Sequence, residues 1–136
     1  MTMKKNRHLD AKGKGEIVYD LKYDTLTFRT KNRDYSKSVE FLNFSADVDK
    51  EGYVTGITIE DASQVFGVDK RFMKEIAHAE FHAEVKKGII SVKIGIVIKK
   101  RNKLMPLTSS EESHTQTFSE KAGKGLLEAS VECATA

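Results

Sequence analysis

Apolar and polar residues alternate along much of the chain before residue 107, with the period of two that is typical of β-strands. Residues 16–21 and 24–29 follow this pattern, are rich in β-branched and aromatic side chains, and are separated by a short polar link. They predict a β-hairpin. Residues 38–44, 46–49 and 53–60 predict three further strands, so the first half of the chain is expected to be mostly β-structure.

The clearest alternation lies in residues 78–86 and 89–100, which the turn Lys86-Lys87-Gly88 joins. The second segment contains the longest apolar row of the chain, made of Ile90, Val92, Ile94, Ile96 and Ile98. Branched side chains at every second position suit a strand better than a helix. We therefore predict a second hairpin whose apolar row lies in the core. If short helices leave part of this row uncovered, the exposed remainder favours a homodimer.

Two short helices are expected between these hairpins. Residues 62–66 predict one, which Gly67 ends. Residues 69–77 predict the other, with Asp69 as its N-cap and an apolar face that points to the core. The predicted fold class is α+β, with a mainly antiparallel sheet of six to seven strands and one or two short helices packed on it.

Three regions follow from the changes in composition. Residues 1–14 are basic and lack periodicity, which predicts a mobile arm. Residues 15–107 predict a single α+β domain. Residues 108–136 are polar and acidic, which predicts a disordered or weakly helical tail. The single cysteine, Cys133, falls in this tail and has no second cysteine for a disulfide, so we expect no function for it.

The composition places the chain among water-soluble proteins, with 39% hydrophobic and 32% charged residues. No apolar run approaches the roughly 20 residues that cross a bilayer. The N-terminal stretch lacks the apolar segment of a signal peptide. We therefore expect a cytoplasmic protein with no membrane partner.

The segment HAEFHAEV, residues 78–85, invites a metal site at His78 and His82. A zinc-protease helix has glutamate directly after the first histidine, whereas this chain has Ala79 there. On the predicted strand the two histidines stand about 13 Å apart, too far to share a metal ion. We predict a solvated face with no metal and no cofactor. A metal protein or enzyme that uses both histidines stays an alternative, for instance across an interface between chains.

Two other segments imitate known sites. Residues 47–52 read DVDKEG, like the start of a calcium loop, but the twelfth position of that loop is Thr58 instead of glutamate. We interpret them as a β-turn. Residues 11–15 lack the preceding strand and the ending of a phosphate-binding loop. No catalytic residue is predicted.

Basic residues are concentrated between residues 86 and 103, where no acidic residue occurs. Together with the basic arm they could contact the phosphates of a nucleic acid. The lysines could equally protect a sheet edge from aggregation. The candidate nucleic-acid contacts are Lys86, Lys87, Lys99, Lys100, Arg101 and Lys103.

Two stretches carry a family resemblance: YDLKYDTLTF at residues 19–28 and DVDKEGYVTGITIEDAS at residues 47–63. Over residues 16–66 the chain resembles a small prokaryotic family of unknown function, the one numbered 2283 among such domains. Thr27 stands where many members have tyrosine. The resemblance implies a small antiparallel β domain and offers no activity and no catalytic residue. Residues 69–107 look like the extension found in longer members.

The sequence does not specify a reaction, because no catalytic set of residues converges in it. The resemblance adds that some small members are suspected partners of toxin-like proteins. The leading hypothesis is a non-enzymatic protein-interaction module that self-associates, with a protein partner. Nucleic-acid binding and a metal or enzyme site at His78 and His82 are the alternatives.

Overall fold

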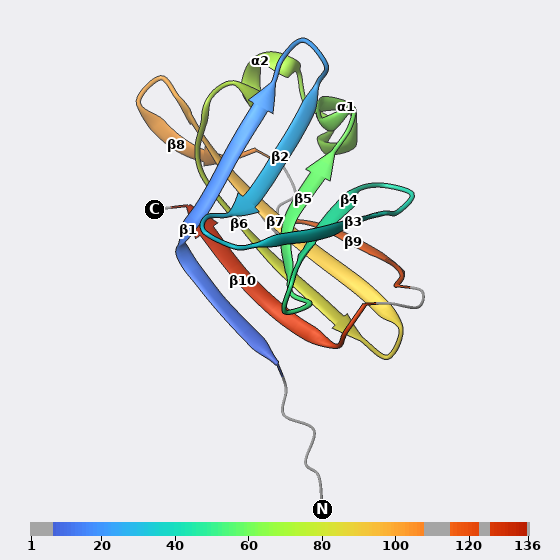
Figure 1. The fold of residues 1–136 in the computed structure, drawn as a ribbon. Helices are drawn as coiled ribbons and strands as arrows, with labels where there is room; N and C mark the ends of the chain where they lie inside the picture. Colours follow the sequence, from blue (N-terminus) through green and yellow to red (C-terminus); the bar gives the residue numbers. More distant parts are fainter. Residues whose placement is uncertain (1–6, 108–114, 123–125, 136) are drawn as a thin grey trace, which may run out of the picture.

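Ten strands and two short helices make up the described part of the chain, which in this computed structural model comprises residues 7–107, 115–122 and 126–135 (Figure 1). In chain order the elements are β1 (His8–Asp20), β2 (Thr25–Thr30), β3 (Tyr35–Glu40), β4 (Ser45–Asp49), β5 (Val54–Ile59), α1 (Ala62–Phe66), α2 (Lys70–Met73), β6 (Ile76–Lys86), β7 (Ile89–Lys100), β8 (Lys103–Pro106), β9 (Thr115–Lys121) and β10 (Ala129–Thr135). The α+β class is confirmed.

All strands belong to one sheet, in the order β3-β4-β5-β2-β1-β10-β6-β7-β8, with β9 also paired to β7. The two predicted hairpins are present as the antiparallel pairs β1–β2 and β6–β7. The prediction of six to seven strands is wrong, because the sheet has ten. The sheet is also mixed, since β1 and β10 pair in parallel.

Of the three additional strands, β8 lies within the predicted domain and β9 and β10 come from the predicted tail, while the predicted arm lengthens β1. Residues 8–14 are the first half of β1, and the tail supplies β9 and β10. Within the described residues, the predictions of a mobile arm and of a disordered or weakly helical tail are therefore wrong. The buried side chains that hold these strands are few or small: Ala11, Phe118, Val131 and Cys133. They are spaced among polar residues and glycines, so the alternation of apolar and polar positions is short and weak in both regions. Residues 1–6, 108–114, 123–125 and 136 lie outside the described residues.

β1 changes partners at Gly15. Before this residue β1 pairs with β10, and after it with β2, with a register shift between Lys12 and Gly15. A Cβ atom on Gly15 would lie 2.8 Å from the backbone of Ala134 and 2.9 Å from the ring of Phe28. Only glycine allows this approach, which brings the two halves of the sheet together.

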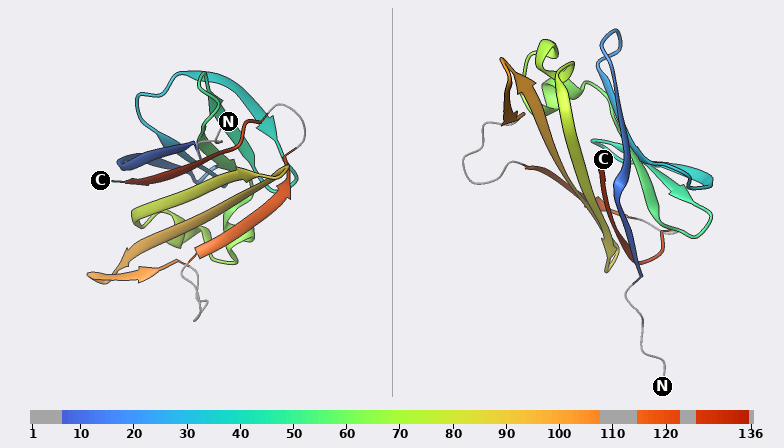
Figure 2. Two further views of the ribbon diagram at one scale, coloured as in Figure 1. Left: turned by 90° about the horizontal axis from the view of Figure 1, so that it is seen from below. Right: turned by 90° about the vertical axis from the view of Figure 1, so that its left-hand side faces the viewer.

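The two halves of the sheet pack face to face around the core, as the right-hand view of Figure 2 shows. Phe28 of β2 meets Phe81 of β6 edge to face, with ring centroids 4.9 Å apart. Phe44 and Phe118 make a second contact between the halves, at 5.9 Å. The apolar row of β7 is at most 4% exposed along its length: Ile90, Val92, Ile94, Ile96 and Ile98. One chain therefore covers this row, and the row itself gives no reason for a dimer.

The helices lie at one end of the sheet, at the top of Figure 1, where Phe66 and Met73 are buried. α1 has the predicted bounds, whereas α2 is shorter than the predicted 69–77 because Ile76 already pairs with Ile98 in the sheet. Asp69 caps α2 as predicted, accepting a hydrogen bond of 2.9 Å from the backbone of Arg71. Neither described helix has the length and apolar character needed to cross a membrane.

Candidate functional site

The HAEFHAEV segment forms the polar outer face of β6. Ala79, Phe81, Ala83 and Val85 are buried, and the alternate residues face away from the core. This confirms that the segment is a strand. The neighbouring strands set the register: His82 lies opposite Glu132 of β10 on one side and opposite Lys93 of β7 on the other.

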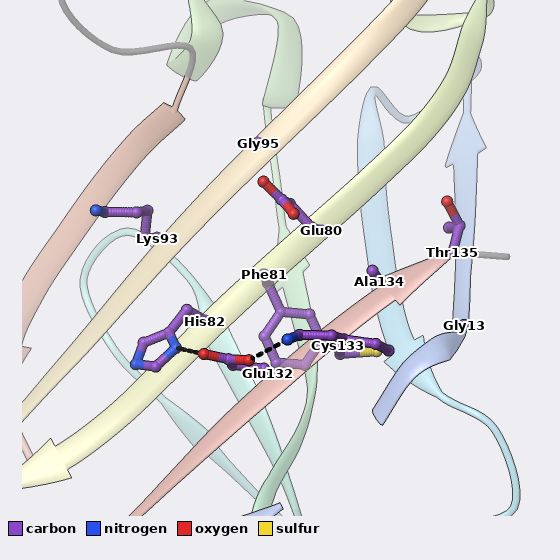
Figure 3. Close-up of a pocket in the computed structure, with 11 residues that line it drawn as sticks. Gly13, Glu80, Phe81, His82, Lys93, Gly95, Glu132, Cys133, Ala134 and Thr135 are labelled. Atoms are coloured by element: carbon purple, nitrogen blue, oxygen red, sulfur yellow. Dashed lines mark ion pairs between the residues drawn. The ribbon is translucent and has the colours of Figure 1, made fainter. Parts of the chain in front are cut away.

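A hollow of about 450 Å³ opens on this face over β1, β10, β6 and β7, and we call it the outer groove (Figure 3). Small residues at Gly13, Gly95 and Ala134 leave the space, and charged side chains stand around it. Phe81 and Cys133 also line the groove, although their side chains belong to the core. The lining residues that carry charge or polar side-chain atoms are Lys12, Glu80, His82, Lys93, Glu132 and Thr135.

Part of this charge is already paired within the groove. The Nζ atom of Lys12 lies 3.2 Å from Oε2 of Glu132, and Nδ1 of His82 lies 3.6 Å from Oε1 of the same carboxylate. The hydrogen bond and charge of Glu132 raise the pKa of Lys12, and Lys12 lowers the pKa of Glu132 in return. Glu132 thus connects β1 with β6 across β10.

Two other charged side chains of the groove have no direct partner among the described residues, although the charge of Glu80 helps to raise the pKa of Lys12. Glu80 and Lys93 are exposed, and neither makes a hydrogen bond or an ion pair with another described residue. Glu80 lies opposite Gly95 on β7, so Lys93 is its diagonal neighbour, roughly 7–8 Å away. The groove therefore presents one anion and one cation that are free to meet a ligand.

The histidine pair does not form a metal site on its own. His78 and His82 are separated along β6, and Nδ1 of His78 lies 2.8 Å from the hydroxyl of Thr135. In the described part of the chain, no cluster of three or more histidine, cysteine, aspartate or glutamate side chains could hold a metal ion. The hypothesis of a site shared between two chains stays a prediction.

The structure divides the predicted nucleic-acid contacts into two groups. Lys86 and Lys87 lie at the β6–β7 turn, and the other four lie at the β7–β8 hairpin: Lys99, Lys100, Arg101 and Lys103. β7, which separates the groups, has 12 residues and is about 40 Å long. The six residues therefore do not make one surface, and their binding of nucleic acid stays a prediction.

The residues that resemble the family motif hold the fold. Asp24 is buried and accepts hydrogen bonds from the hydroxyl of Tyr19 at 2.5 Å, from the hydroxyl of Ser63 at 2.6 Å and from the backbone of Ser63 at 3.0 Å. Burial alone would raise the pKa of Asp24, but these hydrogen bonds outweigh it and lower the pKa. Asp24 thereby fixes the start of α1 from a distant turn.

Residues 47–52, which resemble the start of a calcium loop, run from the end of β4 into a turn, as the sequence predicted. Asp49 is buried and accepts hydrogen bonds from the backbone of Glu51 and Tyr53, each at 2.9 Å, and from the Arg33 guanidinium. Gly52 completes the turn with a φ of +89°. The carboxylate of Asp49 is thus occupied by the chain itself.

Sequence reasoning missed Lys12, Glu132 and Thr135, because it assigned them to the arm and the tail. The usable signal was the alternation of Leu9 and Ala11, and of Val131 and Cys133, with polar neighbours. A strand assignment there would have placed Lys12 and Glu132 on the polar side of their strands, opposite Ala11 and Cys133, whereas Thr135 follows the alternation of Val131 and Cys133. Their meeting with His82 depends on strand order, which the pattern does not contain.

Fold and site together define a mostly β-sheet protein with a charged groove on one sheet face. The chain belongs to a family described as "Protein of unknown function (DUF2283)", whose model matches residues 16–63. It is 30% identical over 91 residues to the uncharacterized protein MJ0789 of Methanocaldococcus jannaschii, covering 66% of this chain and 78% of that protein.

A second relative comes from Methanosarcina mazei and carries the name "Putative hypoxanthine phosphoribosyltransferase". It is 29% identical over 87 residues, covering 64% of this chain and 71% of the relative. No solved structure shows significant similarity to the chain.

Proposed function

We propose that the protein is a non-enzymatic interaction module that binds an extended segment of a partner protein in the outer groove. The observation that carries this proposal is the free pair of opposite charges, Glu80 and Lys93, beside the paired network of Lys12, Glu132 and His82. The strands fix the backbone positions from which these side chains project, so the spacing between them is set before a partner binds.

The spacing of the free charges indicates the chemistry of the partner. Side chains at positions i and i+2 of an extended peptide are about 7 Å apart, close to the separation of diagonal neighbours on a sheet. A partner with an acidic residue and a basic residue two positions apart could therefore pair with Lys93 and Glu80 together. Charged side chains of both signs stand around the groove, which suits a segment that carries both charges.

A peptide-display selection on the full chain tests the proposal. We expect enrichment of peptides that contain an acidic and a basic residue two positions apart. Lys93→Glu should weaken the enriched peptides by roughly tenfold or more, because it replaces an attraction by a repulsion. Exchange of the two charges in the peptide should restore binding to the doubly reversed variant Glu80→Lys, Lys93→Glu.

The matched control is Lys50→Glu, which makes the same charge change on an exposed residue of the β4–β5 turn. It should leave peptide binding unchanged. If no peptide is enriched, or if Lys93→Glu and Lys50→Glu act alike, the groove is not the recognition surface.

Self-association and a cytoplasmic location remain predictions of the sequence. The apolar row of β7 is buried within one chain, so a dimer would need another surface. Light scattering on a size-exclusion column measures the mass directly, and a monomer at all concentrations would remove self-association from the proposal.

We do not extend the name of the Methanosarcina mazei relative to this chain. Phosphate groups commonly bind at the N-termini of helices. Here both described helices already hold a carboxylate of the chain there: Asp24 at α1 and Asp69 at α2. A binding assay with hypoxanthine and with inorganic phosphate tests this conclusion. Saturable binding of either compound would show that the name of the relative does apply to this chain.

A further inference from the structure

Three segments that are far apart in sequence meet at the end of the sheet where the helices lie. They are the β1–β2 turn, the segment around α2 and the β7–β8 hairpin, all at the top of Figure 1 and of the right-hand view of Figure 2. Lys100 lies over the ring of Phe72 at 4.5 Å, and the backbone of Lys99 donates a hydrogen bond of 2.9 Å to the carbonyl of Glu75. We call residues 20–24, 69–75 and 99–105 the basic end.

Positive charge is concentrated there. The basic end holds eight basic and four acidic residues, a net charge of +4, against +3 for the whole chain. One of the acids, Asp24, is buried, and another, Asp69, is paired with Arg71 at 3.3 Å. All eight basic residues are exposed: Lys22, Lys70, Arg71, Lys74, Lys99, Lys100, Arg101 and Lys103.

Large apolar side chains are exposed among these cations. Leu104 is 68% exposed and Met105 42%, both on β8, while Leu21 is 43% and Tyr23 66% exposed in the β1–β2 turn. The two groups flank α2 (Figure 1). The basic end therefore combines a net positive charge with apolar side chains at two projecting turns.

We propose that the basic end docks this protein on the surface of an anionic lipid bilayer. Basic residues near such a surface are attracted to its negative potential, and apolar side chains gain by entering the boundary between headgroups and acyl chains. The two features act together, because a bilayer offers both the charge and the apolar region within a few ångströms. The sequence predicted no membrane partner, but that expectation rested on the lack of a membrane-spanning segment, which surface docking does not require.

A nucleic acid would use the cations but not most of the apolar side chains. Bases stack on aromatic rings and arginine planes, whereas Leu21, Leu104 and Met105 are aliphatic. Their exposure beside the cations favours lipid over nucleic acid. This surface is separate from the outer groove, so the proposal does not depend on the peptide partner.

Co-sedimentation of the full chain with vesicles tests the proposal, using phosphatidylcholine alone or mixed with phosphatidylserine. We expect binding only to the mixed vesicles and a decrease with added salt. The triple variant Lys100→Gln, Arg101→Gln, Lys103→Gln should lower the partition coefficient roughly 100-fold, since each basic residue near the surface contributes about a factor of five. Leu104→Ser with Met105→Ser should also weaken binding, with the charge unchanged.

The matched control is Lys86→Gln with Lys87→Gln, which removes two exposed cations at the far end of β7 and should leave vesicle binding nearly unchanged. Circular dichroism confirms that each variant is folded. Equal binding to both kinds of vesicle, or an equal loss in the control, would overturn the proposal. So would binding to single-stranded or duplex DNA without binding to the mixed vesicles, which would reassign the basic end to nucleic acid.

Discussion

Asp24 provides the sharpest test of how the family-matched segment holds the fold. Its buried carboxylate joins Tyr19 of β1 to Ser63 of α1 through three hydrogen bonds, and its own carbonyl accepts a fourth, of 2.8 Å, from the backbone of Ala62. In addition, Asp24 has a φ of +52°, a conformation that aspartate tolerates better than alanine. We expect Asp24→Ala to be among the most destabilising single substitutions outside the apolar core.

The expected loss follows from the groups left without a partner. The backbone N–H and the hydroxyl of Ser63 are buried, and each unsatisfied buried donor costs about 1–3 kcal/mol. Tyr19 is only partly buried and can turn toward water, so it adds little. The left-handed backbone adds roughly 1 kcal/mol for alanine. We therefore expect a loss of about 3–7 kcal/mol in the free energy of unfolding.

Urea unfolding followed by far-ultraviolet circular dichroism measures this loss, with Asp20→Ala as the control in the same turn. Asp20 is exposed and accepts hydrogen bonds of 3.0 and 3.2 Å from the backbone of Lys22 and Tyr23. Its removal should cost about 1 kcal/mol or less, because water can replace an exposed carboxylate. If the two variants lose the same free energy, Asp24 does not hold α1 in the way described.

The remaining predictions concern the acid limb of stability, the bend of β1 and the burial of β10. Folding lowers the pKa of Asp24 below its ordinary value of 3.8. The ionised carboxylate therefore contributes fully to the free energy of unfolding above pH 3.8, and this contribution is lost as the pH falls through the pKa of the folded state. In urea titrations between neutral pH and about pH 3, the free energy of unfolding of Asp24→Asn should fall less with pH than that of the unchanged chain. Gly15→Ala should lower the free energy of unfolding by about 2–3 kcal/mol through overlap with Ala134, and Gly13→Ala, which meets open space at a φ of +80°, by about 1 kcal/mol in the same assay. Burial raises the pKa of the Cys133 thiol, so iodoacetamide should label it roughly 100-fold more slowly in the native chain than in urea; equal rates would contradict the placement of β10 in the sheet.

Local patterns were enough to predict the elements that carry a long apolar face. The β6–β7 hairpin and α1 agree with the structure because five branched residues in β7, and a stop at Gly67 after α1, are visible within a short window. The first half of β1 was not predicted as a strand, because only Leu9 and Ala11 alternate there among polar residues and glycines. Its pairing with β10 joins residues such as Ala11 and Cys133, and no local pattern reports a contact over that separation.

The same limit applies to the two candidate surfaces. His82 was visible as part of a polar strand face, but its approach to Glu132 depends on the order β10-β6 within the sheet. In the basic end, Lys70, Arg71 and Lys74 read as the solvated side of a short helix. Their meeting with the β7–β8 hairpin depends on how α2 closes the sheet. In both cases the sequence contains the residue types, and the fold supplies the neighbours.

The family match and the candidate surfaces occupy mostly different parts of the chain. Within residues 16–63, several residues of the motif make contacts inside the chain. Asp24 fixes the start of α1, and Asp49 fixes a turn. Gly56 lies against Asp47, whose Oδ2 would be 2.9 Å from an added Cβ. The outer groove is built from β1 before Gly15, from β6, β7 and β10, all outside the match. Most of the basic end also lies beyond residue 63. The carboxylates of Asp24 and Asp49 are bonded to the chain itself, so these two residues of the matched segment stabilise the fold. Both candidate surfaces of this protein are built mainly from the strands and turns outside that segment.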